Sequence, residues 1–72
     1  MTESVYKIIE LVGVSATSWE EATRNAVEQA AATLDDVRIG EVVKLDTRVE
    51  NGKVVAFRAR VQVSFKLRER TD

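Results

Sequence analysis

The stretch that decides the fold is residues 54–68, Val-Val-Ala-Phe-Arg-Ala-Arg-Val-Gln-Val-Ser-Phe-Lys-Leu-Arg. Apolar and polar side chains alternate along it, and a period of two is typical of a β-strand with one buried face. The apolar set is Val55, Phe57, Ala59, Val61, Val63, Phe65 and Leu67, and the polar set is Arg58, Arg60, Gln62, Ser64, Lys66 and Arg68. At about 3.3 Å per residue this strand spans roughly 45–50 Å, which is long for a strand.

A second strand is predicted over residues 37–49. The segment Glu50-Asn51-Gly52-Lys53 separates it from the long strand, and Asn-Gly at the centre of such a segment is a strong signal for a β-hairpin. Its side chains also fall into two sets of opposite parity. The apolar set is Val37, Ile39, Val43, Leu45 and Val49, and the polar set is Arg38, Lys44, Asp46 and Arg48.

Residues 4–12 predict a further strand because they are rich in β-branched and aromatic types, and we expect this strand to end at Gly13. A strand that faces water on one side needs only one apolar face. Here both faces are apolar, with Val5, Ile9 and Leu11 on one and Tyr6, Ile8 and Val12 on the other. We therefore expect cover on both faces, part of it from another subunit.

A helix is predicted after a short connection over residues 14–17. Ser18 is a suitable N-cap, and Glu21 follows three residues later, as in a capping box. The helix is expected to run to about Leu34, and Trp19 in its first turn to pack on a neighbouring strand or subunit. Small residues at every fourth position let the helix lie close to a sheet, and these are Ala22, Ala26 and Ala30.

The predicted order is β-α-β-β, an α+β fold in which one helix packs on a three-stranded antiparallel sheet with the last strand in the middle. The chain has 72 residues, the size of a single domain, residues 1–72. The helix spans only about 25 Å at 1.5 Å per residue, so it leaves part of the long strand bare. A core this small supplies only about 3–5 kcal/mol. Because the chain has no cysteine for disulfides, we expect a homo-oligomer.

The composition disfavours catalysis. Without cysteine or histidine the chain lacks thiolate nucleophiles, the commonest general base and the softer metal ligands. No motif spacing selects a catalytic pair of carboxylates, and no phosphate-binding loop is present, so we predict that the protein is not an enzyme. Two interpretations of the hard oxygen ligands stay open, a divalent cation site or solvated acids; these residues are Asp35, Asp36, Glu41, Asp46 and Glu50.

The net charge of −1 gives no overall attraction to nucleic acid or to an anionic membrane. Phe57 lies on the opposite face of its strand from Arg58 and Arg60, so one surface cannot both stack bases and neutralise phosphates. No apolar run has the length of a membrane span, and the first residues do not have the pattern of a signal peptide. We therefore expect a cytoplasmic protein without a nucleic-acid or membrane partner.

The order, the spacing and the total length of these segments together resemble those of the dodecin family. The similarity covers residues 4–68, and it is carried by Val5–Ser15, by Ser18-Trp19-Glu20-Glu21-Ala22 with Ala26, by Glu41-Val42, by the Gly52 turn and by Val61–Leu67. The resemblance implies a β-α-β-β subunit in a hollow homo-oligomer, a dodecamer with 23 symmetry. It also implies a protein that binds flavins in stacked pairs and stores them or quenches their photochemistry.

The chain departs from the flavin-binding dodecins at two positions. Their stacking tryptophan stands two residues before the Glu-Val pair, where this chain has Ile39, and their flavin-bonding glutamine corresponds to Arg58. The resemblance thus implies a ligand site at Ile39 and Arg58, with Glu41, Arg60 and Gln62 as neighbouring candidates. Ile39 offers apolar contact but no π face, and an aromatic contact is worth about 0.5–1.5 kcal/mol beyond burial.

The function that the resemblance implies is non-enzymatic binding or storage of a small ligand, with flavin, as riboflavin or FMN, the family default. The alternative is a flavin-free variant that acts as a structural shell or binds a divalent cation such as calcium. In that variant, symmetry would bring acids from several chains to one axis.

Overall fold

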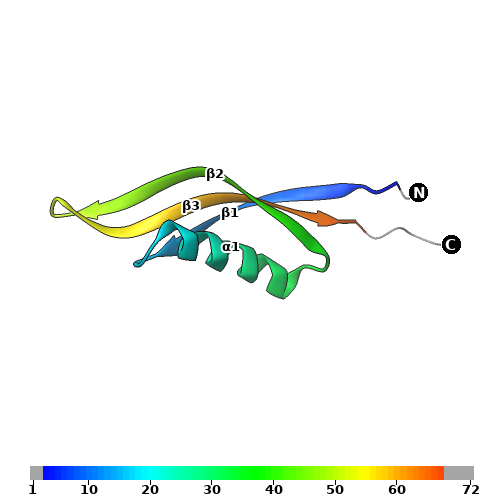
Figure 1. Cartoon of the computed structure of the whole chain (residues 1–72), viewed down its shortest axis with the longest axis horizontal. Coiled ribbons are helices and arrows are strands. Elements are labelled where there is room, and N and C mark those ends of the chain that lie inside the picture. The colour runs from blue at the N-terminus through cyan, green and yellow to red at the C-terminus, as the bar shows by residue number, and fades with distance from the viewer. Residues whose placement is uncertain (1–2, 68–72) are drawn as a thin grey trace.

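The structure, a computed structural model, describes residues 3–67. Its elements are β1 (Tyr6–Ser15), α1 (Trp19–Thr33), β2 (Val37–Glu50) and β3 (Lys53–Lys66) (Figure 1). The strands form one antiparallel sheet in the order β1-β3-β2, and α1 lies against one face of it. The predicted α+β fold, with the last strand in the middle, is confirmed. Arg68, the last residue of the predicted strand, lies outside the described residues.

The core lies between α1 and the centre of the sheet. It contains the predicted alanine stripe of the helix and the central apolar residues of β3, namely Ala22, Ala26, Ala30, Ala59, Val61 and Val63. Alanine side chains are short, so the helix lies close to the strands. This helix is too short and too polar to cross a membrane, and it is the one helix of the described chain.

Hydroxyl side chains fix the start of α1. Ser18 Oγ accepts a hydrogen bond from the backbone N–H of Glu21 at 3.0 Å, as the capping box predicts. Ser15 Oγ accepts one from the backbone N–H of Thr17, also at 3.0 Å. These bonds satisfy amides in the turn and in the first helical turn, where the helix itself offers no acceptor.

β1 is longer than predicted. It continues through Gly13 to Ser15, and Gly13 pairs with Ala59 of β3. A Cβ at Gly13 would overlap the backbone carbonyl oxygen of Ala22, so this glycine provides room for the helix within the strand. The prediction that the strand ends at Gly13 is therefore wrong.

The single parity predicted for β2 is also wrong. Register shifts occur at Val37/Ile39, at Val42/Lys44 and at Arg48/Val49. A β-bulge adds a residue to one strand, so the alternation reverses beyond it. Ile39 pairs with Ser64, whereas Leu45 pairs with Ala59 in the core layer, and these two apolar side chains therefore lie on opposite faces.

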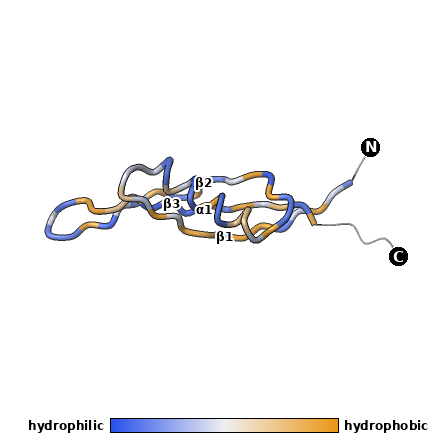
Figure 2. The backbone as a smooth tube through the Cα atoms, turned by 90° about the horizontal axis from the view of Figure 1, so that it is seen from below, coloured by the Kyte–Doolittle hydropathy of each residue, from blue (hydrophilic) through white to orange (hydrophobic). Residues whose placement is uncertain are grey.

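The subunit is elongated. It measures 58 × 19 × 15 Å with a Cα radius of gyration of 15.2 Å, whereas a compact chain of this length has about 11 Å. Val61 and Val63 are the largest fully buried side chains of the described residues. Apolar segments continue along the strands beyond the helix (Figure 2). One subunit thus leaves much of its apolar surface exposed, as the length of β3 predicts.

The β2–β3 hairpin projects beyond the rest of the subunit. β1 ends at Ser15, opposite Phe57, and α1 begins at Trp19, which contacts the Phe57 ring. Residues 48–56, which we call the hairpin arm, extend past both of these elements (Figure 1). At its tip Asn51 and Gly52 have positive φ angles of 52° and 73°, as a tight Asn-Gly hairpin requires.

Candidate functional site

The sheet has one face without a helix, which we call the open face. On β3, the residues that alternate with the buried Ala59, Val61 and Val63 point toward it. The pairing register adds neighbours from both outer strands. The open face comprises Arg58, Arg60, Gln62, Ser64 and Lys66 of β3, Ile39, Glu41, Lys44 and Asp46 of β2, and Tyr6, Ile8, Glu10, Val12 and Val14 of β1.

The structure brings the five predicted site residues onto this one face. Ile39 lies opposite Ser64 and Glu41 lies opposite Gln62, with Cβ atoms about 5 Å apart in such pairs. Arg60 and Arg58 follow along β3 toward the hairpin arm. The Ile39 side chain is 62% exposed, so it offers an accessible apolar surface. Contact of these residues with a ligand stays a prediction.

Arg58 is held by a bidentate ion pair. Its Nε donates to Asp46 Oδ1 at 2.7 Å, and its Nη2 donates to Asp46 Oδ2 at 3.1 Å. The side-chain hydrogen bond from Arg58 is the main reason why the pKa of the Asp46 carboxyl lies below its ordinary value. The same bond raises the pKa of Arg58. An anionic ligand would therefore compete with Asp46 for this guanidinium.

Glu10 of β1 connects two other residues of the open face. Its Oε2 lies 3.4 Å from Arg60 Nε, and its Oε1 accepts a hydrogen bond from Gln62 Nε2 at 3.2 Å. Sequence reasoning missed Glu10 as a site residue. The signal for it is the strand register, since Glu10 is the pairing partner of Gln62 although the two are far apart in the sequence.

Glu41 and Lys44 differ from their charged neighbours on the open face. Both are exposed, and neither forms an ion pair or a side-chain hydrogen bond with any residue of the described range 3–67. The carboxylate of Glu41 is therefore accessible to an external donor or cation.

One subunit does not hold a metal centre by itself. Within residues 3–67, no three acidic side chains gather closely enough to bind an ion. Three of the predicted ligands are instead paired with arginine: Asp36 with Arg38, Asp46 with Arg58 and Glu50 with Arg48. Because Ca²⁺ takes 6–8 oxygen ligands, a calcium site would require carboxylates from several copies of the chain.

Trp19 belongs to the packing of the subunit, as predicted. Its Nε1 donates a hydrogen bond to the backbone oxygen of Asp46 at 3.0 Å. Its ring meets Phe57 edge to face, with centroids 5.1 Å apart and planes at 73°. These contacts fix the start of α1 against β2 and β3, next to the Asp46–Arg58 pair.

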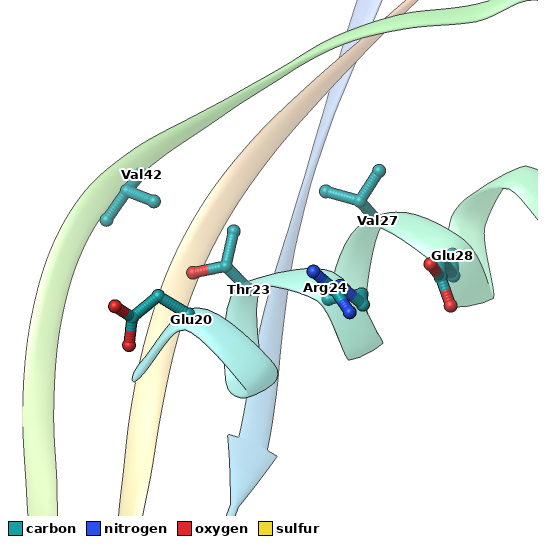
Figure 3. Close-up of a pocket in the computed structure, with 6 residues that line it drawn as sticks. All are labelled: Glu20, Thr23, Arg24, Val27, Glu28 and Val42. Atoms are coloured by element: carbon teal, nitrogen blue, oxygen red, sulfur yellow. The ribbon is translucent and has the colours of Figure 1, made fainter. Parts of the chain in front are cut away.

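A groove that the sequence did not reveal lies between α1 and β2, on the helix side of the sheet. It has a volume of about 450 Å³ and is lined by Glu20, Thr23, Arg24, Val27, Glu28 and Val42 (Figure 3). The helix packs mainly on β1 and β3, so Val42 of β2 stays 42% exposed. The sequence alone did not show on which face of the sheet Val42 lies, because a register shift follows this residue.

Comparison with known proteins assigns the fold and the sequence to one family. The sequence matches the Dodecin family over residues 5–68. The chain belongs to the dodecin family. A calcium dodecin of Mycobacterium tuberculosis (strain ATCC 25618 / H37Rv) is 42% identical over 65 residues, which cover 90% of this chain and 92% of the relative. The family predicted from the sequence is therefore confirmed.

Solved dodecin structures have the same subunit fold. The dodecin from Streptomyces coelicolor has a TM-score of 0.89 and 31% identity, covering 97% of this chain and 100% of that one. The crystal structure of the M. tuberculosis calcium dodecin, described as calcium chelating with a novel calcium-binding site, has a TM-score of 0.80 and 41% identity over 96% of this chain and 99% of that one. Dodecins are non-enzymatic proteins that self-assemble and bind small ligands.

Proposed function

We propose that copies of this chain assemble into a hollow dodecamer that binds a small ligand on the open face and catalyses no reaction. The observation that carries the proposal is the clustering of Ile39, Glu41, Arg58, Arg60 and Gln62 on one exposed face. An apolar side chain beside hydrogen-bonding and charged groups suits a planar ligand with polar edges. Flavin is the first ligand to test. A cytoplasmic location without nucleic-acid or membrane partners stays a prediction.

The surface of one subunit supports assembly. It amounts to 5628 Å², whereas a compact monomer of this mass exposes about 4,500 Å². A surface larger than that of a compact monomer suits a subunit that packs against copies of itself. On the open face, four apolar side chains of β1 are about half exposed: Tyr6, Ile8, Val12 and Val14. Neighbouring subunits would cover such surface.

The charges of the open face nearly balance. Four cations lie there with three anions: Arg58, Arg60, Lys44 and Lys66 with Glu10, Glu41 and Asp46. Arg58 and Arg60 are moreover engaged by Asp46 and Glu10. A ligand phosphate therefore gains little Coulomb energy, and we expect riboflavin and FMN to bind with affinities within about tenfold of each other.

Fluorescence titration tests the flavin assignment. Riboflavin and FMN are titrated with protein at micromolar concentration, with quenching of flavin emission as the readout. Saturable quenching by both, lost at high urea where the protein unfolds, supports the proposal. The absence of quenching at protein concentrations where the particle is intact would remove flavin as the ligand.

A second candidate is calcium, and two observations favour it. The M. tuberculosis relative at 42% identity is named calcium dodecin, and the Glu41 carboxylate has no ion-pair partner within residues 3–67. In a symmetric particle, Glu41 residues of several copies would supply hard oxygen ligands around one ion. This site exists only in the assembly.

Thermal unfolding separates the two ligands. If calcium binds the assembled particle, the Tm rises with added Ca²⁺ and falls with EDTA. Glu41→Gln should abolish this shift, while the matched change Glu3→Gln, an exposed acid before β1, should keep it. A Tm that is the same in Ca²⁺ and EDTA would rule out a stabilising calcium site.

A further inference from the structure

The hairpin arm is a surface that one subunit leaves incomplete. Val49 and Val54 near its tip are 56% and 52% exposed. Pairing with β1 stops at Phe57, so residues 54–56 of β3 have a strand neighbour on one side only within the described chain. A two-stranded ribbon is at best marginally stable in water. The arm therefore needs a partner surface.

The groove between α1 and β2 is a concave surface, whereas the hairpin arm projects from the subunit. Val27 and Val42 form its apolar part, one from each wall (Figure 3). Glu20, Arg24 and Glu28 follow one another along the helix at a spacing of four residues, and all three are exposed. The groove is thus a concave apolar strip with charged groups along one wall.

The charge patterns of arm and groove are complementary. The tip of the arm carries two cations and one anion, Arg48, Glu50 and Lys53, and the groove carries two anions and one cation, Glu20, Arg24 and Glu28. Glu50 is bound by Arg48 at 2.9 Å, whereas Lys53 forms no ion pair within residues 3–67. The tip is thus net positive and the groove net negative, and both carry exposed or half-buried valines, so the two surfaces are complementary in charge and in apolar surface.

We propose that the hairpin arm of one copy docks in the α1–β2 groove of the next copy, head to tail, with Lys53 beside the acidic wall. The proposal rests on the self-assembly proposed above and specifies one of its interfaces. Because each copy offers its arm and receives another at a different surface, the contact is heterologous, and in the closed particle proposed above its repetition forms a ring. Contact between two arms would instead be isologous and stop at a pair.

Disulfide trapping tests the contact directly, because the chain has no cysteine of its own. The variant Lys53→Cys/Glu28→Cys places one thiol on the arm and one in the groove. Within a subunit these positions are roughly 25 Å apart, since the arm and the helix run in opposite directions from Phe57 and Trp19. A disulfide needs Cα atoms within about 7 Å, so any bond joins two copies.

Head-to-tail docking predicts a ladder of dimers, trimers and larger species on a non-reducing gel after mild oxidation. Each single-cysteine variant and the mismatched pair Lys53→Cys/Gln29→Cys should give little product. Efficient dimers from Lys53→Cys alone would overturn the proposal in favour of arm-to-arm contact, and the absence of a ladder from an intact particle would overturn it too. A native mass of one chain would instead contradict the assembly itself.

Charge exchange gives an independent test. Lys53→Glu and Glu28→Lys each place like charges at the contact and should raise the dissociation midpoint on dilution about tenfold. The double variant restores opposite charges and should return to within about threefold of the original midpoint. Lys7→Glu and Gln29→Lys are matched controls outside the contact. The proposal fails if the single variants behave like the controls, or if the double variant dissociates as readily as the singles while circular dichroism shows folded chains.

Discussion

Arg58 and Ile39 define the chemical character of the open face. Arg58 is proposed to stand where flavin-binding dodecins carry a hydrogen-bonding amide, and the bidentate contact with Asp46 satisfies its charge within the subunit. Ile39 supplies apolar surface without a π face. In the proposed ligand site these two residues would combine a charged and an apolar group and would thereby set which ligand groups can bind.

The Asp46–Arg58 pair predicts a pH effect. Because the folded pKa of Asp46 lies below its ordinary value of 3.8, the pair stabilises the fold above that pH, and this stability is lost as the pH falls through the folded pKa. We expect an NMR titration to give Asp46 a pKa below its ordinary value of 3.8 and Arg58→Gln to raise that pKa toward the ordinary value. An unchanged Asp46 titration in Arg58→Gln would contradict the pairing.

Ile39→Trp should strengthen flavin binding if flavin is the ligand. The indole adds an aromatic contact worth about 0.5–1.5 kcal/mol, which corresponds to a riboflavin Kd about 2- to 13-fold lower. Val5→Trp, at an exposed position before β1, is the matched control and should leave the Kd unchanged. Equal effects of the two tryptophans on flavin quenching would show that Ile39 does not contact the ring.

At the scale of the elements, the close packing of α1 on the strands depends on small residues where they touch. Ala22 and Ala26 lie directly over Gly13, where a Cβ would overlap the Ala22 carbonyl oxygen. At Gly40 a Cβ would come within 2.7 Å of Val27 Cγ2, a side-chain atom. The helix backbone therefore lies closest to β1, whereas beside β2, where the groove lies, the contact is made by a side chain.

Gly13→Ala should be strongly destabilising. The new methyl group meets helix backbone, and overpacking of this kind costs about 3 kcal/mol, at the upper end of the usual range. Urea unfolding at fixed protein concentration measures the change in the free energy of unfolding. Gly52→Asn is the matched control, since asparagine tolerates the positive φ and the site is open. A loss for Gly13→Ala no larger than for the control would refute the close helix contact.

Periodicity predicted the elements that depend on local sequence. Alternation in β3, the alanine stripe of α1 and the Ser18 cap each have a pattern confined to one element. The bulges of β2 could not be predicted in this way, because an extra residue shows itself only in the pairing with β3. For the same reason the sequence placed Ile39 on the same face as Leu45. Glu10 was missed because it pairs with Gln62 of a strand far away in the sequence. Family resemblance named the site residues, and the register placed them on one face.

The shape of the whole subunit suits assembly with other copies better than stability as a monomer. The subunit is 58 Å long and carries one short helix, and its largest fully buried side chains in the described part are two valines. The open face, the groove and the hairpin arm are all left for neighbours or ligands. If ligand binding and the stability of the fold both depend on assembly, then ligand affinity and the fraction of folded protein should both decrease as the protein is diluted.

Sedimentation velocity of the purified protein across a dilution series, with circular dichroism on the same samples, shows whether the fold depends on assembly. We expect a closed particle of about twelve chains, with folded structure lost as the particle dissociates. A single chain that sediments alone, stays folded at the lowest concentration and melts cooperatively would refute this dependence.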